Sequence, residues 1–304
     1  MVLTSTTNRT SLKQLLEQGP VLAPCVYDCF SALVVEKLGF QAMCLSGGEA
    51  AASLVGVPDI GLCSFEEVCA LVNRITCVSS LPMIVDIDTG YGNELNVIRT
   101  CQRAAQAGAM AVHLEDQKWP KRAGHMAGKQ VIPLEDYAAK IKAAKYALKD
   151  TDCLLIARTD AFHAIDKEAA IERMLAAREA GADLCFIDQP DTKDAIYEIA
   201  ERVPGWKMFG MASYGGSPRM TFEELTSLGF NLCTLHFTMS AARLMMETWA
   251  KTIVTEKNDF CVEAYLKEHP HIASRHDIVK TQEWLALGSM LNPNIKQAER
   301  LQAK

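Results

Sequence analysis

Residues 83–92 read Met-Ile-Val-Asp-Ile-Asp-Thr-Gly-Tyr-Gly, an apolar run that closes on two carboxylates and a glycine turn. The run Met83–Asp88 predicts a strand. On a strand, residues two apart point the same way, so Asp86 and Asp88 would project together from its end. Two such anions repel each other unless a cation or a proton lies between them. Mg2+, which keeps several of its waters, suits this pair. The plainer alternative is an Asp-Gly turn with a solvated acid.

Short apolar runs alternate with longer amphipathic stretches along the whole chain. The predicted strands are Val21–Val26, Ala42–Leu45, Met83–Asp88, Ala111–Leu114, Leu154–Arg158, Leu184–Asp188, Met208–Met211 and Leu232–His236. The helical patterns between them include Val97–Ala107, Tyr137–Leu148, Lys167–Glu179 and Phe222–Ser227. About eight such repeats without a linker predict an α/β fold, a parallel (β/α)8 barrel of the TIM type. A doubly wound open sheet is the alternative.

The domain organisation follows from the same pattern. We expect one α/β-barrel domain over residues 1–304, with the barrel at 12–255 and a C-terminal helical extension at 256–304. The extension contains helical patterns and no strand pattern. We expect its extra helices to dock on a neighbouring subunit rather than close the barrel.

Composition excludes several classes of function. The formal net charge of −6 gives no basic surface for nucleic acid or an anionic membrane. No apolar run reaches membrane-spanning length, and residues 1–13 have no apolar signal core. The 11 cysteines are scattered without a zinc spacing, and several lie inside apolar strands. These features predict a soluble cytoplasmic protein with reduced thiols.

Polar side chains stand where the predicted strands end. In barrel enzymes the chemistry lies at the carboxyl ends of the strands. Each side chain alone could cap a helix or satisfy a backbone group. Together they favour a metal-dependent site for an anionic substrate. They are Ser46, Asp86, Asp88, His113, Glu115, Arg158, Asp188 and His236.

The segment after the fourth strand is long, basic and punctuated by glycine. Residues 118–129 read Lys-Trp-Pro-Lys-Arg-Ala-Gly-His-Met-Ala-Gly-Lys. Such loops act as lids over anionic substrates. Lys121, Arg122 and His125 could neutralise carboxylates, and the Gly124 N–H could approach one closely. An ordinary solvated basic loop is the alternative.

Six ordered motifs resemble the isocitrate lyase/phosphoenolpyruvate mutase superfamily, between about residue 12 and residue 290. The resemblance is closest to the short methylisocitrate lyase and 2,3-dimethylmalate lyase branch. It implies an α/β barrel, Mg2+ that Mn2+ could replace, a small 2-oxo or 2-hydroxy carboxylate substrate, and a homotetramer, a dimer of dimers, that swaps a C-terminal helix. The motifs are Ser46-Gly47-Gly48, Pro58-Asp59-Ile60-Gly61, Asp86-Ile87-Asp88-Thr89-Gly90-Tyr91-Gly92, His113-Leu114-Glu115-Asp116-Gln117, Lys121-Arg122-Ala123-Gly124-His125 and Ala157-Arg158-Thr159-Asp160.

The resemblance also implies roles for individual residues. The metal site would comprise Asp86 and Asp88, with Asp88 the more direct ligand, and Asp59 and Glu115 on the metal's waters. The substrate-binding residues would be Ser46, Gly47, Gly48, His113, Gly124, Arg158 and Asp188. The catalytic residues would be Glu115, Lys121, His125, Arg158 and His236. In this scheme Mg2+ polarises the 2-oxygen as the adjacent carbon–carbon bond breaks, arginine orients a carboxylate, and the closed loop excludes water.

Four positions depart from the lyase pattern. The loop cysteine, taken as the acid that protonates the departing carbanion, is Ala123, and a methyl group cannot donate a proton. A tyrosine two residues before Ser46 is Cys44. A glutamate after the sixth strand is Asp188, and an asparagine after the seventh aligns with Gly210. Because several positions differ together, we favour natural divergence over an engineered Cys-to-Ala change.

Three functions remain open. The first is a Mg2+-dependent carbon–carbon lyase that releases a 2-oxo acid such as pyruvate. The second is an oxaloacetate-type decarboxylase or hydrolase that uses His236, because a histidine at this position of the rim occurs in an oxaloacetate decarboxylase branch of the superfamily. The third is a catalytically silent barrel that binds a metabolite. The Lys-Arg-x-Gly-His phrase disfavours a phosphonate mutase.

Overall fold

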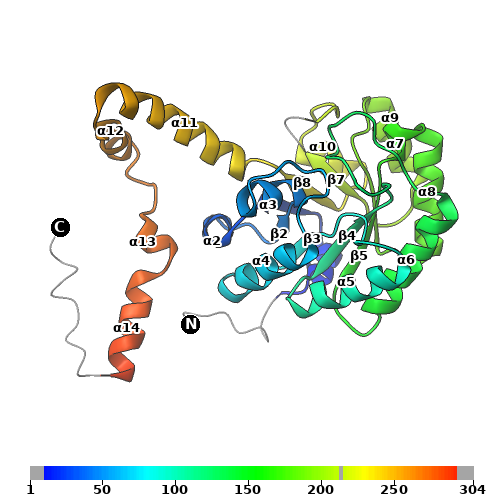
Figure 1. Ribbon diagram of the computed structural model, residues 1–304, viewed down its shortest axis with the longest axis horizontal. Coiled ribbons are helices and arrows are strands. Elements are labelled where there is room, and N and C mark those ends of the chain that lie inside the picture. The colour runs from blue at the N-terminus through cyan, green and yellow to red at the C-terminus, as the bar shows by residue number, and fades with distance from the viewer. Residues whose placement is uncertain (1–9, 212–214, 293–304) are drawn as a thin grey trace. The chain divides into compact units, whose positions relative to one another are not determined.

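The computed structural model describes residues 10–211 and 215–292 (Figure 1). They divide into a larger unit that ends at Met239 and a smaller one that begins at Ser240. The larger unit is a barrel of eight parallel strands surrounded by helices. The predicted (β/α)8 barrel is confirmed, and the doubly wound open sheet is wrong.

The strands pair in the order β6-β5-β4-β3-β2-β1-β8-β7. Between β6 and β7 the ring is joined by a parallel bridge of Cys185 with Lys207, where the Cys185 N–H donates to the Trp206 carbonyl at 3.1 Å. The bounds are β1 (Val21–Val26), β2 (Met43–Leu45), β3 (Met83–Asp86), β4 (Ala111–Glu115), β5 (Leu154–Thr159), β6 (Leu184–Ile187), β7 (Met208–Met211) and β8 (Leu232–Leu235).

Helices alternate with these strands and begin at conventional caps. Helix α4 begins after Ser64, whose side chain and that of Glu67 form a reciprocal capping box. Gly108 and Gly181 follow α5 and α8 with φ of 103° and 106°, a conformation that favours glycine. The bounds are α1 (Leu12–Gln18), α2 (Cys29–Lys37), α3 (Gly47–Leu54), α4 (Phe65–Val78), α5 (Glu94–Gln106), α6 (Leu134–Leu148), α7 (Ala161–Ala164), α8 (Lys167–Glu179), α9 (Lys193–Arg202) and α10 (Phe222–Ser227).

Two apolar layers hold the barrel together, because alternate residues of a strand face opposite sides. Cys44, Ile84 and Ile156 belong to the cluster inside the barrel. Their neighbours, such as Val85 and Leu155, belong to the cluster between strands and helices. The parallel register pairs Asp86 with His113 and Glu115 with Arg158, so the polar strand ends lie at one rim.

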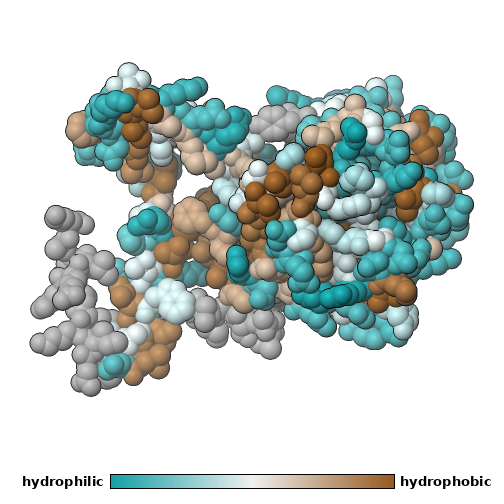
Figure 2. Space-filling model, viewed as in Figure 1, coloured by the Kyte–Doolittle hydropathy of each residue, from teal (hydrophilic) through white to brown (hydrophobic). Residues whose placement is uncertain are grey.

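The smaller unit is helical. It contains α11 (Thr238–Glu256, whose first two residues belong to the larger unit), α12 (Phe260–Glu268), α13 (Arg275–Ile278) and α14 (Thr281–Leu291). Helices α11, α12 and α14 bury none of their residues. Figure 2 shows apolar surface over α12 and α14, where Phe260 and Trp284 are exposed. The barrel limits 12–255 and the single-domain description stay predictions. No helix in the described part of the chain is long and apolar enough to cross a membrane.

Candidate active site

Asp86 and Asp88 lie buried at the carboxyl end of β3. Only Asp86 is in the strand, so the expectation that β3 extends to Asp88 is wrong. Asp88 has φ of 47°, and its N–H donates to Asp86 Oδ1 at 2.9 Å. This turn, rather than strand alternation, keeps the two carboxylates together. Burial raises the pKa of Asp86, but His113 and other nearby cations hold it at about 2, whereas burial raises the pKa of Asp88 to about 6.

Lys121 joins the β4–α6 loop, residues 116–133, to this acid pair. Its ammonium lies 2.9 Å from Asp88 Oδ1 and also forms an ion pair with Asp59. The lysine side chain is buried. Burial lowers the pKa of Lys121, but Glu115, Asp88 and other carboxylates raise it by more, so it stays above its ordinary value. A protein cation therefore lies at the aspartates in this structure.

Arg158, at the end of β5, lies among carboxylates in the interior of the site. Its Nε and Nη2 donate to Asp160 at 3.0 and 3.2 Å. Nη1 is 3.3 Å from Glu115, and Nη2 is 3.4 Å from Asp188. Burial raises the pKa of Glu115 well above its ordinary value, although Arg158 opposes the rise. The guanidinium thus bridges the ends of β4, β5 and β6.

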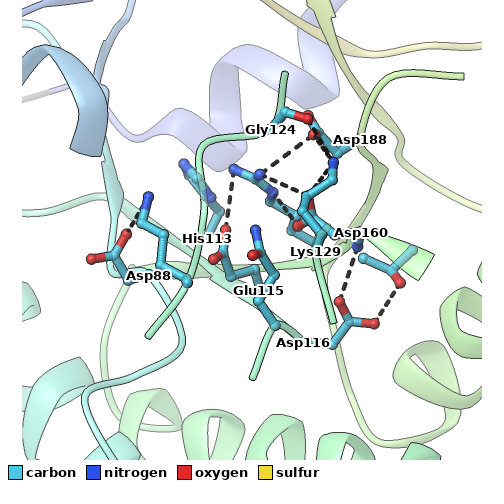
Figure 3. A network of polar contacts seen from close by, with 12 residues as sticks. Asp88, His113, Glu115, Asp116, Gly124, Lys129, Asp160 and Asp188 are labelled. Atoms are coloured by element: carbon cyan, nitrogen blue, oxygen red, sulfur yellow. Dashed lines mark hydrogen bonds and ion pairs between the residues drawn. The ribbon is translucent and has the colours of Figure 1, made fainter. Parts of the chain in front are cut away.

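A second lysine of the β4–α6 loop ties this group to the loop. Lys129 Nζ donates to Asp160 Oδ1 at 2.9 Å, to Asp188 Oδ2 at 3.4 Å and to the Gly124 carbonyl at 2.6 Å. Figure 3 shows Gly124, Lys129, Asp160 and Asp188 gathered on one side of Glu115, with Asp88 on the other. Gly124 lies so close that a Cβ there would stand 2.3 Å from Asp188 Oδ2.

Two imidazoles line the remaining part of the rim. His113 Nε2 lies 3.7 Å from Asp86 Oδ2. His236 Nδ1 lies 3.5 Å from Glu49, and its Nε2 lies 3.5 Å from Cys25 Sγ. Burial lowers the pKa of His236, but Glu49, Cys44 and Asp188 together raise it by more, so its pKa lies above its ordinary value.

The Ser46-Gly47-Gly48 segment forms the start of helix α3, beside the aspartates. Ser46 is the N-cap residue, and the Gly47 N–H donates to Asp86 Oδ2 at 3.2 Å. A Cβ on Gly47 would stand 2.9 Å from that oxygen, and one on Gly48 would stand 3.2 Å from Asp59 Oδ2. The glycines therefore allow a helix N-terminus, which favours anions, to approach the acids.

The structure brings together most of the residues expected in the site, but not His125. Its side chain is exposed and makes no hydrogen bond or ion pair within the described residues. The assigned roles of all these residues stay predictions. Sequence analysis assigned no role to Lys129, Asp160, Asp116 or Glu49. Asp160 and Asp116 follow recognised strand ends, a signal that could have identified them, whereas Lys129 is only one basic residue of a basic loop.

The donor chemistry fits a hard dication that keeps its waters. Glu115 Oε1, Glu115 Oε2 and Asp88 Oδ1 are buried and accept no hydrogen bond from the described residues, although Arg158 forms an ion pair with Glu115 Oε2 and Lys121 forms one with Asp88 Oδ1. The acids Asp59, Asp86, Asp88, Glu115, Asp160 and Asp188 outnumber the lysines and arginine among them. In the described part of the chain, no group of three or more His, Cys, Asp or Glu side chains is arranged to hold a metal ion. Mg2+ binds through one or two carboxylates and water, which suits these acids.

Comparisons with known proteins show the family to which the chain belongs. A family model described as phosphoenolpyruvate phosphomutase matches residues 12–254. The petal death protein of Dianthus caryophyllus is 43% identical over 230 residues, which cover 75% of this chain and 72% of that protein. The 2,3-dimethylmalate lyase of Eubacterium barkeri is 38% identical over 232 residues, which cover 75% of this chain and 80% of that protein.

Solved structures show the same fold. An oxaloacetate acetylhydrolase in complex with 3,3-difluorooxalacetate superimposes with a TM-score of 0.84 at 28% identity, over 92% of this chain and 96% of that one. A phosphonopyruvate hydrolase in complex with oxalate and Mg2+ superimposes with a TM-score of 0.79 at 26% identity, over 93% and 98% of the two chains. From the family model, the related sequences and the shared barrel, the chain belongs to the phosphoenolpyruvate phosphomutase family, in the PEP mutase/isocitrate lyase superfamily of lyases and mutases.

Proposed function

We propose that this protein is a Mg2+-dependent lyase. It cleaves the carbon–carbon bond next to the 2-oxygen of a small 2-hydroxy or 2-oxo di- or tricarboxylic acid, of the methylisocitrate or dimethylmalate kind, and releases a 2-oxo acid such as pyruvate. The observation that carries the proposal is the buried group of acids at the β3 and β4 ends, in which both Glu115 oxygens and Asp88 Oδ1 accept no hydrogen bond from the described residues. The similarity to 2,3-dimethylmalate lyase supports the substrate class.

Asp86 and Asp88 would hold the dication, with Asp59 and Glu115 on its waters. When bound, Mg2+ supplies electron withdrawal from the 2-oxygen of the substrate. Mn2+ would substitute, because the ligands are oxygens. Asp86 suits a ligand because its low pKa, which His113, Lys121 and Arg158 together hold down against the effect of burial, keeps it ionised at neutral pH.

Arg158 would orient a substrate carboxylate. Its contacts with Glu115 and Asp188 are 3.3 and 3.4 Å, longer than the 3.0 Å bond from Nε to Asp160. A substrate carboxylate would replace these longer contacts while Asp160 holds the guanidinium plane. Gly47 and Gly48, at the α3 N-terminus, would receive the other acid end of the substrate. The β4–α6 loop, in which Ala123 is buried, would exclude water.

A second candidate is an oxaloacetate-type hydrolase or decarboxylase. His236 favours it, because the imidazole stands at the end of β8 between Glu49 and Cys25. Ala123 also favours it, because the loop lacks a proton donor at that position. The superposition on oxaloacetate acetylhydrolase supports the same reading. The third candidate, a silent binding protein, has less support because such a protein has no need of this acid cluster.

A substrate panel separates these functions. Small 2-oxo and 2-hydroxy di- and tricarboxylic acids are incubated with the protein and Mg2+, and release of pyruvate, glyoxylate and oxalate is followed. Pyruvate release from methylisocitrate or dimethylmalate supports the lyase. Turnover of oxaloacetate alone, unchanged in Ala123→Cys, supports the second candidate. Stabilisation by Mg2+ with oxalate but no turnover of any acid supports the third.

We also propose a homotetramer, a dimer of dimers, in the cytoplasm. Exposed Phe260, Trp284 and Met290 on the C-terminal helices favour burial against another subunit that swaps this helical segment. Free thiols on buried cysteines such as Cys101 and Cys233 favour a reducing compartment. Light scattering of the purified protein tests the assembly, and a monomer would overturn it. A fluorescent fusion tests the location, which a membrane or organelle signal would overturn.

A further inference from the structure

We propose that Lys129 is a positioning residue that holds the β4–α6 loop closed over the ends of β5 and β6. The claim about the loop stands on contacts within this chain. Only its consequence for turnover rests on the proposed function.

The Lys129 ammonium is buried, and its contacts match the number of its donors. An ammonium has three N–H groups. Nζ lies 2.6 Å from the Gly124 carbonyl, 2.9 Å from Asp160 Oδ1 and 3.4 Å from Asp188 Oδ2. One partner belongs to the tip of the loop, and the other two follow β5 and β6. Lys129 therefore connects the loop tip to the barrel rim (Figure 3).

The two carboxylates have another cation. Arg158 donates to Asp160 at 3.0 and 3.2 Å and lies 3.4 Å from Asp188. Within the described residues, the Gly124 carbonyl accepts a hydrogen bond from Lys129 only. Removing the ammonium would therefore leave the acids paired with arginine but release the loop tip. This difference distinguishes a lysine that holds the loop in place from one that only neutralises the two carboxylates.

The loop tip also fits the rim sterically. A Cβ on Gly124 would stand 2.3 Å from Asp188 Oδ2, closer than side chains tolerate. A side chain at residue 124 would force either the loop or the Asp188 carboxylate, which Lys129 and Arg158 hold, to move. Gly124 and Lys129 thus serve the same closure, one by leaving space and the other by a charge-assisted hydrogen bond.

At its other end the loop meets the acids of β3 through a different lysine. Lys121 contacts Asp59 and Asp88, and Asp88 lies on the opposite side of Glu115 from Lys129 (Figure 3). Loss of Lys129 should free the segment around Ala123 and Gly124 and leave the Lys121 contacts in place. The consequence for catalysis is a lower kcat, with a smaller change in KM, because closure excludes water after the substrate has bound.

Hydrogen exchange of the substrate-free protein tests the loop claim. In Lys129→Met, amides of residues 118–130, including Met126 N–H on the Ala123 carbonyl, should exchange about tenfold faster or more, as expected from losing one charge-assisted hydrogen bond. Exchange in α6 and α8 should not change. Lys118→Met is the matched control, because Lys118 is an exposed lysine of the same loop. Lys129→Arg should restore part of the protection.

Two results would overturn the inference. One is wild-type exchange of the loop in Lys129→Met, and the other is faster exchange spread equally over the barrel helices. If Lys129→Met does not fold, Gly124→Ala replaces it, because that variant keeps every charge and should still open the loop. Unchanged loop exchange in Gly124→Ala would then contradict closure. Because these measurements need no substrate, their failure is distinct from failure of the proposed lyase activity.

Discussion

Lys121 Nζ lies 2.9 Å from Asp88 Oδ1, so a side-chain cation occupies part of the space that the acid pair offers to a dication. The same ammonium contacts Asp59. An ion that binds to Asp88 must therefore share that carboxylate with lysine or displace it. This relationship makes the affinity for metal and the position of the β4–α6 loop interdependent.

Replacing Lys121 with methionine should strengthen dication binding. The variant removes a competing positive charge near Asp88, and about tenfold tighter binding of Mn2+ corresponds to 1.4 kcal/mol of lost repulsion. Calorimetric titration of Mn2+ measures the change. Lys118→Met, on the exposed part of the loop, is the control and should bind like wild type. Weaker binding in Lys121→Met would show that the lysine helps to build the metal site.

Asp88→Asn should abolish dication binding and leave the barrel folded. The amide keeps the shape of the side chain but removes the charge that attracts the ion. Loss of thermal stabilisation by Mg2+, with an unchanged circular dichroism spectrum, is the expected result. The exposed Asp152, before β5, provides the control Asp152→Asn. Wild-type Mg2+ binding in Asp88→Asn would remove this residue from the metal site.

Dication affinity should fall as the pH drops below about 6. Burial raises the pKa of Asp88 from 3.8 to about 6, so protons compete with the metal below that value. Affinity should then fall by about tenfold per pH unit, by linkage. The stability of the metal-free fold should change in the opposite direction. Because the pKa of Asp88 is higher in the folded protein, protonated Asp88 contributes to folding stability at low pH, and this contribution is lost as the pH rises through about 6. Titrations with Mn2+ between pH 5 and 8 measure this dependence. An affinity that does not change with pH would contradict the raised pKa of Asp88.

Arg158→Lys should raise KM for the acid substrate by about tenfold, the cost of one charge-assisted hydrogen bond. Lysine keeps the charge, but it lacks the planar fork that Asp160 holds through Nε and Nη2. Initial rates over a range of substrate concentrations measure the effect. Arg122→Lys is the control, because Arg122 is exposed on the loop. An unchanged KM would show that Arg158 serves the protein acids alone.

Asp116→Ala should destabilise the barrel by about 3–5 kcal/mol, since it leaves a buried arginine without its partner. Asp116 accepts hydrogen bonds from Thr159 at 2.5 Å, the Asp160 N–H at 2.9 Å and Arg173 at 3.1 Å. Urea denaturation measures the loss. The exposed Glu135→Ala, at the start of α6, should change stability little. A similarly small change in Asp116→Ala would mean that water replaces these bonds.

Strand periodicity made most of the site predictable. Because Ala111–Glu115 and Leu154–Thr159 are apolar runs that end in polar residues, Glu115 and Arg158 could be placed at one rim, and the register pairs them. Asp88 was harder to place. Asp88 follows β3 in a left-handed conformation. The run Met83–Asp88 does not reveal this, because apolar and acidic residues alternate in the same way through the end of the strand and the turn.

The amino-acid sequence by itself determined the barrel, the order of its strands and the identity of the polar residues at their ends. Only the tertiary structure decided which charges pair, as Lys129 with Asp160 and Asp188, or Lys121 with Asp59 and Asp88. The physical reason is one of range. Strand alternation and helix caps are set by neighbouring residues. An ion pair instead depends on where a loop crosses the barrel rim, and Lys129 is 31 residues from Asp160 and 59 residues from Asp188 in the sequence.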